Sequence, residues 1–186
     1  MPRKRIKPRR IVINGRSISL RLEPEFWYWF RQIAAELGTS APKLIEAIDK
    51  ARNPDRSLSS TIRVFVACYL HDHPSPPTRK LRSVTIQAGW HSQGRSIKAH
   101  RIAIHGHQTS LRLEPEYWFW LRQIAVECGM TAKTFIESIN IAKDPSRPLS
   151  SALRCSIAAY FHGNPYPIYR VDGHGCIARL FLERGA

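Results

Sequence analysis

Two short segments carry polar side chains at every second position, a spacing that places them on one face of a β-strand. The residues are Ser17, Ser19 and Arg21 in the first segment, and Gln108, Ser110 and Arg112 in the second. Arginine donates two parallel hydrogen bonds to guanine O6 and N7, glutamine pairs with adenine, and serine bonds either base. These residue types therefore suit the reading of base edges in a nucleic-acid groove. A face that only meets water is the simpler explanation, but it does not account for an arginine at the same place in both segments.

Each polar segment follows a turn that joins two runs of alternating apolar and polar residues. Asn14-Gly15 lies between such runs in the first half, and this dipeptide is the strongest short signal for a β-hairpin. His105-Gly106 takes its place in the second half. The pattern predicts two β-hairpins, each with one apolar and one polar face.

Three helices are expected after each hairpin. Pro24 suits a first helical turn, and Gly38 suits the residue that ends this helix. Ser40 is a good N-cap for a second helix and Ser59 for a third. The counterparts in the second half are Pro115, Gly129, Thr131 and Ser150. The fold class predicted is α+β.

The second half repeats the first, since Arg101 stands 91 residues after Arg10 and residues 6–74 match residues 97–165 without a gap. Two copies are too few for a solenoid, so the repeat predicts two equal halves paired about a pseudo-two-fold axis. The expected divisions are a basic arm (1–9), unit 1 (10–74), a basic linker (75–100), unit 2 (101–165) and a tail (166–186) that forms a possible hairpin.

The segments "SLRLEPEFWYWFRQIA" and "SLRLEPEYWFWLRQIA", followed in each half by I-E-x-I and L-S-S, resemble a ribbon-helix-helix family of bacterial proteins. The resemblance covers both halves. It implies that two units pair their strands antiparallel, interlock their helices and place the paired strands in the major groove of DNA. Base contacts then fall on the six alternating polar residues named above. The resemblance also implies phosphate contacts at the helix starts, at Ser40 with Lys43 and at Thr131 with Lys133.

Basic charge is concentrated outside the repeated cores. Of a formal net charge of +15, residues 1–10 supply six basic groups with no acid, and residues 75–95 supply four with no acid. Segments of this kind commonly bind polyanions, although a solubilising tail is the plainer alternative. Phosphate contacts are accordingly expected from Arg3, Lys4 and Arg5.

The resemblance implies a minimal unit of one strand and two helices, so each unit here adds an upstream strand and a third helix. The added strand raises a question of width. Four strands about 4.8 Å apart make a sheet roughly 15 Å across its backbones, whereas the major groove is about 12 Å wide. Either the outer strands twist away from the groove, or the ribbon does not enter the groove as it does in ribbon-helix-helix proteins with one strand per unit.

The linker is long enough for the two units to pair within one chain, and a homodimer with exchanged partners is the alternative. Fusion also lets the halves differ, as Ser17 and Gln108 do. Identical halves favour palindromic sites, so unlike halves predict an asymmetric site.

The favoured function is a sequence-specific DNA-binding regulator, most simply a repressor, in the cytoplasm and associated with the nucleoid. The alternatives are a non-specific DNA or RNA binder that organises nucleoprotein, and an adaptor for other proteins. An enzyme is the weakest option, because acids at helix starts explain the glutamate pairs Glu23/Glu25 and Glu114/Glu116. No cofactor, metal or membrane partner is expected. Trp29 and Trp120 are expected to fill the core between the units, and a site for another protein is the alternative.

Overall fold

The structure is a computed structural model that describes residues 6–13, 15–73 and 97–163. We call residues 6–73 unit 1 and residues 97–163 unit 2. Unit 1 contains β1 (Arg9–Ile13), β2 (Arg16–Leu20), α1 (Pro24–Glu36), α2 (Ala41–Ala51) and α3 (Leu58–Asp72). Unit 2 contains β3 (Ala99–Ile104), β4 (His107–Arg112), α4 (Pro115–Glu127), α5 (Ala132–Ala142) and α6 (Leu149–His162). The predicted α+β class, with a hairpin and three helices in each unit, is confirmed.

Both predicted hairpins form, and each is an antiparallel pair within its own unit. In the second hairpin, His105 and Gly106 have φ values of 47° and 79°. Positive φ at both central residues defines the turn whose twist matches that of the strands it joins. Gly15 has a φ of 73° in the first hairpin, whereas Asn14 lies outside the described residues.

Most helix boundaries follow the sequence signals. Pro24 begins α1, and the Ser40 hydroxyl caps α2 by accepting a hydrogen bond from the backbone N–H of Lys43. The prediction that Ser59 and Ser150 cap the third helices is wrong. Ser57 caps α3 and Pro148 precedes α6. In both units the N-cap position therefore lies two residues before the predicted serine.

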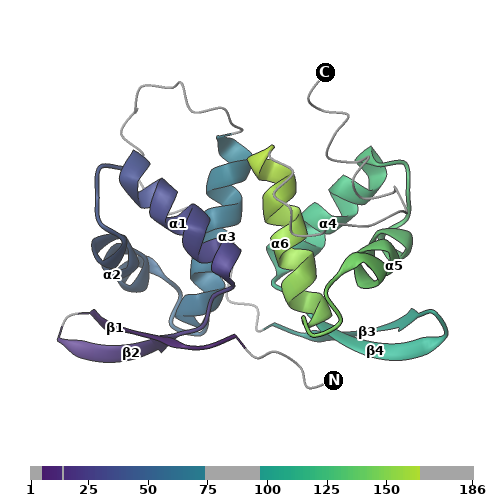
Figure 1. Ribbon diagram of the computed structural model, residues 1–186, viewed down its shortest axis with the longest axis horizontal. Helices are drawn as coiled ribbons and strands as arrows, with labels where there is room; N and C mark the ends of the chain where they lie inside the picture. The colour runs from purple at the N-terminus through teal and green to yellow at the C-terminus, as the bar shows by residue number, and fades with distance from the viewer. Residues whose placement is uncertain (1–5, 14, 74–96, 164–186) are drawn as a thin grey trace.

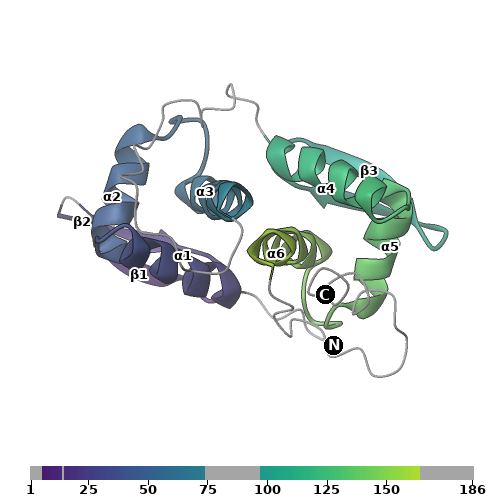
Figure 2. The ribbon, with the colours of Figure 1, turned by 90° about the horizontal axis from the view of Figure 1, so that it is seen from above.

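The core lies inside each unit and continues through the centre of the molecule. Within unit 1 the largest wholly buried side chains include Phe26, Phe30 and Phe65. Figure 1 shows α3 of unit 1 and α6 of unit 2 side by side in the centre of the molecule. Figure 2 shows the same pair from above, with α1 and α2 on one side and α4 and α5 on the other. The two units therefore pair within one chain about a pseudo-two-fold axis, as predicted.

The expected pairing of strands between the two units is wrong. The described residues form two separate two-stranded sheets, β1-β2 and β3-β4. Two features account for this. The added strand of each unit already pairs with the polar strand, and the two units meet through α3 and α6, which lie side by side in the centre (Figures 1 and 2). No four-stranded ribbon is present among the described residues, so the question of its width does not arise.

Candidate DNA-binding surface

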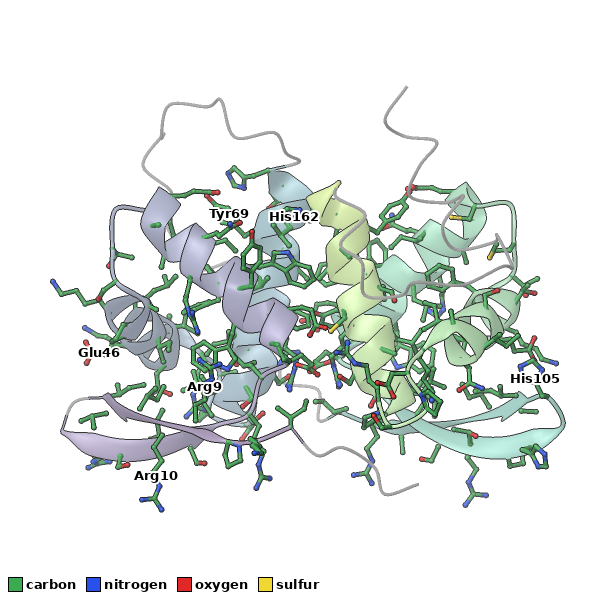
Figure 3. All side chains as sticks on the ribbon, in the orientation of Figure 1. Arg9, Arg10, Glu46, Tyr69, His105 and His162 are labelled. Atoms are coloured by element: carbon green, nitrogen blue, oxygen red, sulfur yellow. The ribbon has the colours of Figure 1, made fainter. Side chains whose placement is uncertain are left out.

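The face of each hairpin that points away from the helices is polar and basic. In hairpin 1 the alternation that buries Ile13 and Leu20 turns five residues outward, and all five are exposed. These residues, which we call outer face 1, are Arg10, Val12, Ser17, Ser19 and Arg21. Figure 3 shows Arg10 pointing away from the body of the molecule. The three residues predicted from the sequence, Ser17, Ser19 and Arg21, therefore do lie together on an open surface.

Hairpin 2 presents an equivalent surface. Its exposed residues that point away from the helices, which we call outer face 2, are Ala99, Arg101, Ala103, Gln108, Ser110 and Arg112. Both hairpins lie along the same side of the molecule, and their turns point outward in opposite directions (Figure 1). One straight surface, such as a face of a duplex, can therefore contact both.

Two further arginines, Arg10 and Arg101, were not predicted from the sequence and belong to the first strand of each hairpin. The strand register places Arg10 opposite Ser19 and Arg101 opposite Ser110. The turn dipeptides fix this register, so counting outward from the turns would have found both residues. Arg9 lies on the other face of β1, with its guanidinium 5.1 Å from the centre of the Trp27 ring.

The inner end of each outer face is bound to the third helix of its own unit. The Arg21 backbone N–H donates to the Ser59 hydroxyl at 3.3 Å, and its carbonyl accepts from Arg63 Nη2 at 2.9 Å. In unit 2 the Arg112 carbonyl accepts from Arg154 Nη2 at 3.0 Å. These bonds fix the backbone of Arg21 and Arg112, while their side chains are left exposed.

Arg63 and Arg154 are held in turn by buried carboxylates. Arg63 Nε lies 2.7 Å from Glu23, and Arg154 Nε lies 2.7 Å from Glu114. Burial lowers the pKa of Arg63, but the attraction of Glu23, its hydrogen bond and a further attraction from Glu114 outweigh burial, so the pKa is raised. Arg63 therefore keeps its charge and its fixed position beneath the hairpin.

Reciprocal ion pairs join the two units. Arg56 donates to both carboxylate oxygens of Glu116, at 2.9 and 3.2 Å. The residues related by 91 positions form the matching pair, with Arg147 Nη2 2.6 Å from Glu25. Such reciprocity is what a two-fold interface requires. Because these pairs lie at the starts of α1 and α4, directly after the hairpins, they set the position of one hairpin relative to the other.

Further contacts between the units occur along the central helices. The Tyr117 hydroxyl donates to the Arg63 carbonyl at 2.9 Å, and burial, with Glu114 nearby, raises the pKa of Tyr117 well above its ordinary value. Trp29 lies 6.0 Å from the ring of His162, and Trp120 lies 6.5 Å from that of His71. The prediction that both tryptophans fill the core between the units is confirmed.

The predicted phosphate sites at the helix starts are not on the outer faces. The helix α2 packs on β1 from the helix side of the hairpin (Figure 1). Ser40 and Thr131 act as helix caps, and Lys43 is exposed. Lys133 lies 3.9 Å from Glu137. Arg3, Lys4 and Arg5 of the arm lie outside the described residues.

The four glutamates of the two pairs have a structural role that was not predicted from the sequence. Glu23 and Glu114 bind arginines of their own unit, and Glu25 and Glu116 bind arginines of the other. In the described part of the chain, no three histidine, cysteine or acidic residues cluster in a way that suits a metal ion. None of the described helices combines the length and apolar character that a membrane span requires.

A comparison with known protein families identifies the family of this chain. The model of the ribbon-helix-helix domain matches the chain twice, over residues 6–70 and 97–161. The chain therefore belongs to the ribbon-helix-helix family, a class of DNA-binding domains, and carries two tandem copies of the domain. No curated protein and no solved structure matches the chain significantly.

Proposed function

We propose that this chain is a sequence-specific regulator of transcription that binds double-stranded DNA through both hairpins. The observation that carries the proposal is the pair of outer faces, each with two exposed arginines, on one side of one molecule. The simplest mode of regulation is repression by occupying an operator in the nucleoid.

Each hairpin has the dimensions that the major groove accepts. Two strands lie about 4.8 Å apart, and a two-stranded ribbon fits a groove about 12 Å wide. Alternate residues of a strand are about 6.8 Å apart, close to the rise of two base pairs. The polar residues of β2 and β4 would then contact successive bases, with Ser17, Ser19 and Arg21 on one half-site.

The pseudo-two-fold axis suits a duplex. The axis runs between α3 and α6 toward the side that bears the hairpins (Figure 1), and a duplex has local two-fold axes perpendicular to its length. Aligning the two would place the hairpins in two stretches of major groove, as in dimers whose half-sites lie about one helical turn apart. Lys43 and Lys133, with the arm residues Arg3, Lys4 and Arg5, would add phosphate contacts on the flanks.

Competition binding tests the proposal. The DNA selected from a random duplex pool is labelled, and unlabelled copies of it or of random duplex compete at stated salt. A specific binder prefers its site by about 10³ or more. Equal competition by random duplex would contradict the proposal and would indicate a protein that organises nucleoprotein without reading sequence.

A further inference from the structure

The outer faces of the two hairpins share a frame. Apart from Ala99, which lies opposite Arg112 and has no counterpart in outer face 1, they differ at one cross-strand pair. The frame is an arginine opposite a serine, Arg10 with Ser19 and Arg101 with Ser110, followed by Arg21 or Arg112. The next pair toward the turn is Val12 with Ser17 in hairpin 1 and Ala103 with Gln108 in hairpin 2. Both members of this pair change between the units.

Packing in the core does not explain why residue 12 is a valine. Its exposed fraction is 65%, whereas the neighbouring Ile13 is 3% exposed and buried beneath the hairpin. On a polar surface, a free methyl group beside hydrogen-bonding side chains matches the groove edge of thymine, whose C5-methyl group accepts apolar contact. Ala103 supplies a shorter apolar group at the equivalent place.

Residues that face each other across an antiparallel pair have Cβ atoms about 4.5–5.5 Å apart. That separation is little more than the rise of one base pair, about 3.4 Å. The two side chains of the pair therefore reach the same base pair or adjacent ones, so the first strand contacts bases beside those that the second strand contacts.

We infer that both strands of each hairpin read bases, and that the pairs Val12–Ser17 and Ala103–Gln108 make the two half-sites different. This inference rests on the proposed function. Gln108 selects adenine through two hydrogen bonds, and Ala103 leaves room beside it. Ser17 accepts several bases, while Val12 favours thymine through its methyl groups. Arg10, Arg21, Arg101 and Arg112 supply the guanine contacts that the half-sites share.

Exchanging the pair between hairpins tests the inference. The variant Val12→Ala/Ser17→Gln gives hairpin 1 the pair of hairpin 2, and Ala103→Val/Gln108→Ser does the reverse. Sites for each variant and for the native chain are selected from random duplex at one salt concentration. The substituted side chains are exposed, and thermal unfolding checks that each variant folds as the native chain does.

The native chain is expected to select a site with two unlike half-sites. Each exchange variant is expected to select a palindrome, and its preference at the affected base pairs should change at least tenfold. The single variants Val12→Ala and Ser17→Gln are each expected to give part of the change. Matched controls come from Arg16 and His107, which also differ between units but occupy the register that faces the helices. The exchange Arg16→His/His107→Arg is expected to leave the half-sites unlike.

The outcomes separate the inference from the proposed function. Absence of any selected sequence for the native chain would overturn both. A specific native site that is already palindromic, or that stays asymmetric after both exchanges, would overturn the inference alone. Conversion by Ser17→Gln with no effect of Val12→Ala would overturn the part that assigns base reading to β1.

Discussion

Arg56 of unit 1 donates two hydrogen bonds to the carboxylate of Glu116 in unit 2, and both side chains are largely buried. With the matching pair of Arg147 and Glu25, this contact connects the loop before each third helix to the start of the other unit's first helix. The hairpin immediately precedes that first helix. The same contacts that join the units therefore determine where the two outer faces lie.

Removing one partner of this pair should destabilise the molecule. We expect Arg56→Ala to lower the free energy of unfolding by about 3 kcal/mol, since it leaves the carboxylate of Glu116 buried without its partner. Urea unfolding followed by circular dichroism measures the change. Lys133→Ala, which removes a lysine exposed beside Glu137, is the control and should cost less than about 0.5 kcal/mol. Equal effects of the two substitutions would contradict the structural role of Arg56.

The arginines at the inner ends of the outer faces should carry base preference. We expect Arg21→Ala and Arg112→Ala each to lose about 1–3 kcal/mol of discrimination at one guanine. Binding to a panel of single-base variants of the selected site measures this. Arg31→Ala, which removes an exposed arginine on α1, is the control and should preserve the preference. A loss that is uniform over all sequences would show that Arg21 and Arg112 contact phosphates instead.

The basic arm should contribute affinity without specificity. Each phosphate contact adds about −0.9 to the slope of log K against log salt. Replacing Arg3, Lys4 and Arg5 by alanine should therefore make the slope less steep by about 2.7 if all three bind phosphate. Relative affinities for different sites should stay the same. An unchanged slope would exclude these residues from the interface.

Acidification should weaken the interface near Trp29. Burial lowers the pKa of His162 below its ordinary value of 6.5, and Glu36 opposes this only in part. The unfolded chain thus binds the proton more readily, so the stability contributed by neutral His162 is complete above about pH 7 and is lost as the pH falls through the lowered pKa.

His162→Phe should remove this contribution while keeping a ring against Trp29. The free energy of unfolding of the native chain should fall between pH 7.5 and 5.5, with a slope from this residue of at most about 1.4 kcal/mol per pH unit. The variant should show a flatter profile over that range in urea unfolding. An identical profile in both proteins would assign the pH dependence to other groups.

The fold was largely predictable because its signals are local. The turn at Gly15, the proline that begins α1 and the cap at Ser40 depend on neighbours in the sequence, and the repeat, which aligns without a gap, revealed the two units. The separation of the two sheets was not predictable in this way. It depends on which long-range contact, strand to strand or α3 to α6, fills the centre of the molecule.

The sequence predicted the residues that the second strand of each hairpin contributes to the candidate site, but not those of the first strand. Alternation along one strand identified Ser17, Ser19 and Arg21, but Arg10 joins them through the register of the hairpin, which involves a second strand. The ion pairs of Glu23 and Glu25 were missed because their partners, Arg63 and Arg147, are far away in the sequence. Acids at a helix start have a sufficient local explanation, and the sequence gives no sign that a distant arginine is also required.

The central claim is that the two hairpins read bases in the major groove, and modified DNA tests it most directly. Replacing the guanines of the selected site by 7-deazaguanine removes the N7 acceptor in the major groove and leaves base pairing and the minor groove intact. We predict that the native chain loses affinity for the modified site and that Arg21→Ala/Arg112→Ala shows a smaller further loss on it, because only Arg10 and Arg101 then remain to contact guanine. Full affinity of the native chain for the modified site would contradict the account.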